Sequence, residues 1–110
     1  MTTAAYPLQK ISLQQTRACL GICRHCYGGT TSVQPCHAEL PDIILALEIA
    51  VELLKMDSKL AHGQLCDCAE RCVAGANRWE RSRHPRCRQS ALACRAFAGY
   101  WKTRASRWVG

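Results

Sequence analysis

The stretch AELPDIILALEIAVELLKM, at residues 38–56, decides the fold class of this chain. Its apolar residues recur at positions 40, 43, 44, 47, 50, 51 and 54, a three-and-four spacing that is typical of a helix with one buried face. Glu48, Glu52 and Lys55 fall outside that stripe. A helix with a single apolar face needs neighbours to cover it, so the flanking sequence must supply them.

A first helix is predicted over about residues 8–27. Pro7 suits its first turn, and Gly28 and Gly29 mark its end. Residues 28–37 then form the longest connector, which fits a surface loop between antiparallel neighbours.

Two further helices are predicted after the central one, over about residues 59–81 and 85–104. Asp57 and Ser58 are suited to capping the first of them. The second begins at Pro85, because the residue before a proline avoids helical angles. Four helices with short links predict an all-α fold, an antiparallel up-down-up-down four-helix bundle.

Length and composition predict one domain over residues 1–110. The chain is 48% apolar, enough for one core, and its 110 residues leave no room for a second. The longest apolar run, residues 43–54, is interrupted by Glu48 and Glu52 and is too short to cross a bilayer. We therefore expect no association with a membrane.

Nine cysteines in so short a chain indicate a chemical role. The first ten residues are polar and mixed and do not resemble a secretory signal, so we expect a cytoplasmic protein with reduced thiols. In that compartment a cysteine-dense sequence more often binds metal than forms disulfides, and an odd count prevents complete internal pairing.

Most of the cysteines have helical spacing that places them on inward faces. They are Cys19, Cys23 and Cys26 on the first helix, Cys68 and Cys72 on the third, and Cys87 and Cys94 on the fourth. Because the first and third helices run parallel, the long connector and the turn at His84 lie at the same end of the bundle. We expect all of these sulfurs except that of Cys68 to converge there, with Cys36 and His84 near the mouth. Cys66 and Cys68 are expected deeper in the bundle.

The predicted metal ligands are these eight cysteines and one histidine: Cys19, Cys23, Cys26, Cys36, Cys68, Cys72, Cys87, Cys94 and His84. Soft thiolates select Cu(I) and Zn(II), and a row of them suits Cu(I) in sites shared between neighbours. Zn(II) is the weaker interpretation, because only Cys23 and Cys26 have the two-residue gap of a typical zinc site.

The same residues resemble a known family, the Cys-rich four-helix-bundle proteins once grouped as a domain of unknown function, which includes the bacterial copper storage proteins. The likeness is carried by three segments: Cys68-Ala69-Glu70-Arg71-Cys72, His84-Pro85-Arg86-Cys87 and Ala93-Cys94-Arg95. The first-helix cysteines are also similar. The resemblance covers about four-fifths of the chain and implies a bundle that stores Cu(I) through inward cysteines.

This chain looks like a cysteine-depleted member. Non-cysteine residues stand where the family pattern places cysteines: Leu65, Gly75, Trp79, Ser90, Phe97 and Trp101, with Ile43 and Leu47 on the second helix. We therefore expect a smaller thiol cluster at one end and an ordinary apolar core in the far half.

Other functions are compatible with parts of the sequence. Buried cysteines also act as small packing groups, which allows a structural or partner-binding bundle without metal. Residues 71–110 carry ten basic groups and one acidic group, so a patch for acidic partners is an alternative, although a nucleic-acid role is disfavoured. Exposed apolar residues on the second helix predict a homo-oligomer.

A redox enzyme is the remaining alternative. Cys23 and Cys26 have the spacing of a thiol–disulfide motif, but they fall near a helix C-terminus, where the helix dipole disfavours a thiolate. The sequence has no paired carboxylates, Ser-His-Asp set or phosphate loop. We expect a metal-binding protein that is not an enzyme.

Overall fold

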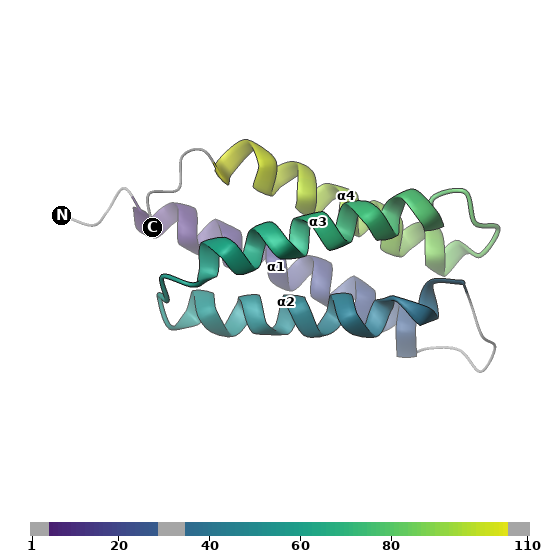
Figure 1. The fold of residues 1–110 in the computed structure, drawn as a ribbon, viewed down its shortest axis with the longest axis horizontal. Helices are drawn as coiled ribbons and strands as arrows, with labels where there is room; N and C mark the ends of the chain where they lie inside the picture. Colours follow the sequence, from purple (N-terminus) through teal and green to yellow (C-terminus); the bar gives the residue numbers. More distant parts are fainter. Residues whose placement is uncertain (1–4, 29–34, 106–110) are drawn as a thin grey trace.

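The structure, a computed structural model, describes residues 5–28 and 35–105. Four long helices account for most of them: α1 (Ala5–Gly28), α2 (Leu40–Lys55), α3 (Ala61–Trp79) and α4 (Pro85–Ala105). A 3-10 helix, η1 (Pro35–Ala38), precedes α2. Successive helices run in opposite directions, and each packs against two neighbours in the ring α1–α2–α3–α4 (Figure 1). The predicted all-α four-helix bundle is confirmed.

The helix limits differ from the predicted ones by up to three residues, and the difference between α2 and α3 has a local cause. Asp57 has a positive φ of 55°, a left-handed conformation that aspartate tolerates better than most residues. The Leu60 N–H then donates to Ser58 Oγ at 3.1 Å, and the Ala61 N–H to the Ser58 carbonyl at 3.1 Å. The chain needs these residues to reverse direction, so α3 begins two residues after the predicted start.

The inward face of α2 follows the predicted stripe. Its buried residues are Leu40, Ile43, Ala46, Leu47, Ala50, Val51 and Leu54. The predicted stripe included Ile44, but this residue is only half-buried, and Ala46 is buried instead. The buried face of α2 is therefore rotated slightly from the predicted one. Within the described ranges, no helix is both long and apolar enough to cross a bilayer.

The core formed by the four helices has two chemically different ends. Toward η1 the inward positions carry sulfur, including Cys26, Cys87 and Cys36. Toward the turn between α2 and α3 they carry bulky apolar groups, including Leu54, Leu65 and Trp101. The candidate site therefore lies in the half of the bundle nearest the long connector.

Candidate metal centre

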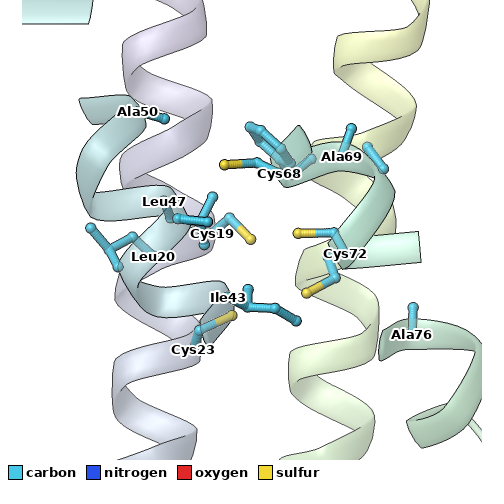
Figure 2. Packing of buried hydrophobic residues seen from close by; sticks show 14 of the residues in the cluster. Cys19, Leu20, Cys23, Ile43, Leu47, Ala50, Cys68, Ala69, Cys72 and Ala76 are labelled. Atoms are coloured by element: carbon cyan, nitrogen blue, oxygen red, sulfur yellow. The ribbon is translucent and has the colours of Figure 1, made fainter. Parts of the chain in front are cut away.

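Three thiols from three helices meet inside the bundle. The Sγ atoms of Cys19 on α1, Cys72 on α3 and Cys94 on α4 all lie within 4.8 Å of one another. These side chains are at most 3% exposed. The sulfurs of Cys19 and Cys23 on one side and Cys72 on the other point into the space between the helices (Figure 2). In the described part of the chain, this is the one group of three or more cysteine, histidine or carboxylate side chains close enough to share an ion.

Cys23 extends this group to four thiols. It lies one helical turn after Cys19 and forms hydrogen bonds with both Cys19 and Cys94. We call Cys19, Cys23, Cys72 and Cys94 the four-thiol cluster. Helical spacing explains it: positions four apart on α1 share a face, and the antiparallel packing of α3 and α4 brings Cys72 and Cys94 to the same level.

The four-thiol cluster does not titrate as four independent groups. Hydrogen bonds with Cys19, Cys23 and Cys72 hold the pKa of Cys94 well below its usual range. The hydrogen bond with Cys23, those with Cys72 and Cys94, and burial raise the pKa of Cys19. One thiolate is thus favoured by its neighbours, while the other thiols retain their protons until a cation compensates the buried charge.

A second pair of thiols lies nearer the end of the bundle. Cys87 Sγ on α4 is 2.9 Å from Cys36 Sγ in η1, and both side chains are fully buried. Burial, followed by the hydrogen bond with Cys87, raises the pKa of Cys36 to about 12. Cys26 lies close enough to both Cys23 and Cys36 to raise the pKa of each. Cys26 therefore links the four-thiol cluster to the Cys36–Cys87 pair.

The copper storage protein family matches residues 7–104 of the chain. The chain belongs to that family. Separate comparisons with curated proteins and with solved structures gave no match. The match spans all four helices, so it covers the sulfur-lined half and the apolar half alike.

Most residues that stand where the pattern of this copper storage family has cysteines are buried apolar groups. Leu65, Phe97 and Trp101 are each at most 2% exposed and fill the half of the core away from η1, as predicted. Trp79 is different, because it lies at the C-terminal end of α3, at the sulfur-lined end. Its ring packs over Gly75, where an added Cβ would come within 2.7 Å of the indole. Apolar replacement is therefore not confined to the far half.

Two of the predicted ligands stand apart from the thiol groups described above. Cys68 is buried on α3, and burial, followed by the charge of Asp67, raises its pKa to about 12. His84 is exposed in the turn between α3 and α4, and its backbone N–H donates to Ser82 Oγ at 3.1 Å. Metal ligation by either residue stays a prediction.

Two residues of the site differ from what sequence reasoning predicted: Ser90 was noted only as a replaced cysteine position, and Cys66 was expected deep in the bundle. Ser90 is fully buried on α4, between Cys87 and Cys94, and its Oγ has no hydrogen-bond partner among the described residues. Cys66 lies outside the core and contacts His62 and Trp101. The four-residue spacing of His62 and Cys66 was a usable signal, since such residues are neighbours on a helix surface.

Proposed function

We propose that this chain binds and stores Cu(I) in the cytosol through the thiolates of its core. The observation that carries the proposal is the approach of three sulfurs, from α1, α3 and α4, to within 4.8 Å of one another. Family membership supports copper as the cargo. Thiolate sulfur is a soft ligand and selects a soft ion such as Cu(I).

Binding would resolve the electrostatic conflict in the four-thiol cluster. Hydrogen bonds with neighbouring sulfurs, followed by burial and the charges of those sulfurs, raise the pKa of Cys19 and of Cys72, so both keep their protons. A Cu(I) ion supplies positive charge at that point, so thiol protons leave as copper–sulfur bonds form. The surrounding apolar residues exclude water, and Cys26 and the Cys36–Cys87 pair would extend the same chemistry toward the end of the bundle.

Zn(II) is the second candidate cargo. Cys23 places a fourth sulfur beside Cys19 and Cys94, and four thiolates are a common structural zinc set. However, Cys23 is not in the group whose sulfurs are all mutually within 4.8 Å. Three close sulfurs fit the low coordination of Cu(I) better than a closed tetrahedron.

Other roles receive less support. Within the basic region, residues 71–110, several arginines form ion pairs with carboxylates: Arg78 with Glu39, Arg95 with Glu80 and Arg71 with Asp67. This pairing reduces the positive charge offered to an acidic partner, so we do not assign nucleic acid as one, and we infer a storage protein rather than an enzyme. Leu45 and Ile49 on α2 are 56% and 43% exposed, and we propose that this face supports a homo-oligomer.

The test is an anaerobic titration of the reduced chain with Cu(I) against a competing chelator. The variant Cys19→Ala/Cys72→Ala/Cys94→Ala should lose most of the tight uptake, because its central sulfurs are gone. The matched control is Thr16→Ala, which changes a fully buried residue one turn before Cys19 without removing sulfur. Thr16→Ala should keep the uptake of the unaltered chain.

Two outcomes would decide against the proposal. Equal uptake by the triple variant and the unaltered chain would mean that the core thiols only pack. Tighter retention of Zn(II) than of Cu(I), measured with a chelator for each ion, would mean that the stored ion is Zn(II) and not Cu(I).

A further inference from the structure

Cys66 is the one cysteine among the described residues that does not belong to the core. It is half-buried and lines an open groove between α3 and α4, together with Ala69, Val73 and Trp101. Its neighbour two positions along, Cys68, is 1% exposed and faces the interior. The sulfur of Cys66 is thus available to ligands that do not enter the bundle.

A histidine and a tryptophan hold this sulfur. His62 Nδ1 lies 3.9 Å from Cys66 Sγ, one helical turn earlier on α3. The indole N–H of Trp101, on α4, donates to Cys66 Sγ at 3.3 Å. The rings of His62 and Trp101 meet edge to face, with centroids 5.4 Å apart. Two elements of the fold therefore fix a soft sulfur beside an imidazole nitrogen.

We propose that His62 and Cys66 form a separate, externally accessible site for one Cu(I) ion. The site uses none of the core thiols, so it stands whether or not the core stores copper. Thiolate and imidazole are both ligands that bind copper well.

The separation of the two donor atoms fits an ion bound between them. Metal–thiolate and metal–imidazole bonds are roughly 2.3 and 2.0 Å long, so donors about 4 Å apart can bind one ion after little movement. Among residues 5–28 and 35–105, no third cysteine, histidine or carboxylate joins the pair closely enough to form a larger ligand group. A two-ligand site favours Cu(I) over Zn(II), which prefers four ligands.

Trp101 has a defined part in this site. The indole N–H is a donor only, so it supports the sulfur better when the sulfur is a negatively charged thiolate. Trp101 is 2% exposed, which keeps that donor in place. On binding, the Cys66 S–H bond breaks and its proton passes to solvent, while bonds from copper to sulfur and nitrogen form. Copper remains Cu(I), and no electron is transferred.

Accessibility distinguishes this site from the core. Cys66 can exchange an ion directly with a thiol carrier approaching along the groove, whereas Cys72 and Cys94 are fully buried. Copper at His62 and Cys66 should therefore exchange faster with added small thiols than copper in the four-thiol cluster.

The test uses the full, reduced chain, with Cu(I) added anaerobically and the indole N–H resonances followed by NMR. In the unaltered chain, the Trp101 signal should shift and saturate as the outer site fills. Cys66→Ser should abolish that response and lower the total uptake by about one equivalent, since it removes one of two ligands. His62→Gln should weaken the site by roughly tenfold or more, because losing even an outer-shell partner of a metal ligand costs about that much.

The matched control is Val73→Ala, on the same helix and lining the same groove but offering no ligand atom. It should retain the Trp101 response that Cys66→Ser loses, and circular dichroism should show every variant folded. An unchanged Trp101 response and unchanged uptake in Cys66→Ser would overturn the proposal. So would an affinity unaffected by His62→Gln, because a purely structural histidine predicts that result.

The same data separate this proposal from copper storage in the core. Failure of the core proposal would leave about one equivalent bound, all of it lost in Cys66→Ser, because the two ligand sets share no residue. Failure of the outer site would leave core uptake intact and Cys66→Ser indistinguishable from the unaltered chain.

Discussion

The two halves of the core share the same four helices but differ in what their inward positions carry. We call the half nearest η1 the thiol half; its buried cysteines are Cys19, Cys23, Cys26, Cys36, Cys72, Cys87 and Cys94. The apolar half, nearest the turn between α2 and α3, is defined by Leu54, Leu65, Phe97 and Trp101. One backbone arrangement thus supports two kinds of interior.

The difference teaches that fold and chemistry are separable in this bundle. Large apolar side chains contribute more buried area, and hence more stability, than a cysteine does. A thiol packs as a small apolar group and leaves the helix register unchanged. The apolar half can therefore stabilise a bundle in which cysteines occupy most inward positions of the other half.

The largest expected effect comes from comparing two single alanine variants on α3, one in each half of the core. Leu65→Ala should lower the free energy of unfolding by about 2–5 kcal/mol, because it removes a fully buried side chain and leaves a cavity. Its uptake of Cu(I) should not change. Cys72→Ala should show the opposite pattern, with a smaller loss of stability and weakened uptake. Denaturant unfolding and chelator competition measure the two quantities.

If Leu65→Ala reduced copper uptake as strongly as Cys72→Ala, the two halves would not be separable. A folded state confirmed by circular dichroism for both variants is the necessary control.

A second expected effect concerns Cys68, which lies on α3 between Leu65 and Cys72. Burial raises the pKa of this thiol from 9.0 to about 12, so the folded state holds its proton more strongly than the unfolded state. Its contribution to stability is complete below pH 9 and is lost as the pH rises toward 12. The slope is at most about 1.4 kcal/mol per pH unit for one proton.

Unfolding of the reduced, metal-free chain at pH 8, 9.5 and 10.5 measures this loss. The variant Cys68→Ala should show a shallower decline over the same range. Parallel curves for the two proteins would mean that Cys68 is not the group responsible.

A third, smaller effect is expected at Gly75, where an apolar replacement intrudes into the thiol half. Alanine there would place a Cβ 2.7 Å from the Trp79 ring, which is 1% exposed and donates from Nε1 to Glu39 at 3.3 Å. Overpacking costs about 1–3 kcal/mol, and alanine regains up to about 1 kcal/mol of helix propensity. Thermal unfolding should show a net loss of about 1 kcal/mol.

Gly63 supplies the control, because nothing lies within 4 Å of the Cβ that alanine would add there. Gly63→Ala should be neutral or stabilising. A stabilised Gly75→Ala would show that the indole has room to move.

The smallest effect is expected from a surface ion pair. Arg71→Ala removes a partner of Asp67, at 2.8 Å and four positions away on α3, and both side chains are about half exposed. Exposed pairs of this kind contribute little to stability, and still less in high salt. Copper uptake should not change, and a larger loss of stability at high salt than at low salt would contradict the ion-pair explanation.

Much of the fold could be predicted because its signals are local. The stripe from Leu40 to Leu54 repeats with the helical period, and Gly28 and Pro85 mark helix limits. Helical spacing also predicted that Cys19, Cys72 and Cys94 meet, since the antiparallel order fixes which levels face one another. The turn at Asp57 was placed less well, because its left-handed conformation depends on how two packed helices are joined.

The rest of the site depends on contacts between distant residues. Cys36 was expected only near the mouth of the bundle, and its approach to Cys87 follows from how η1 packs against α2 and α3. The position of the Trp79 ring over Gly75 and the hydrogen bond from Trp101 to Cys66 also depend on side-chain packing. No period in the sequence encodes such packing.

The closeness of Cys36 and Cys87 has a mechanical consequence. These residues are 51 positions apart in the chain, yet their sulfurs are 2.9 Å apart. A cargo ion held by both would act as a removable staple that restricts the unfolded chain, as a disulfide does, without any oxidation. The metal-loaded protein would then resist unfolding more than the metal-free protein. Its resistance to denaturation would therefore rise with the amount of ion bound.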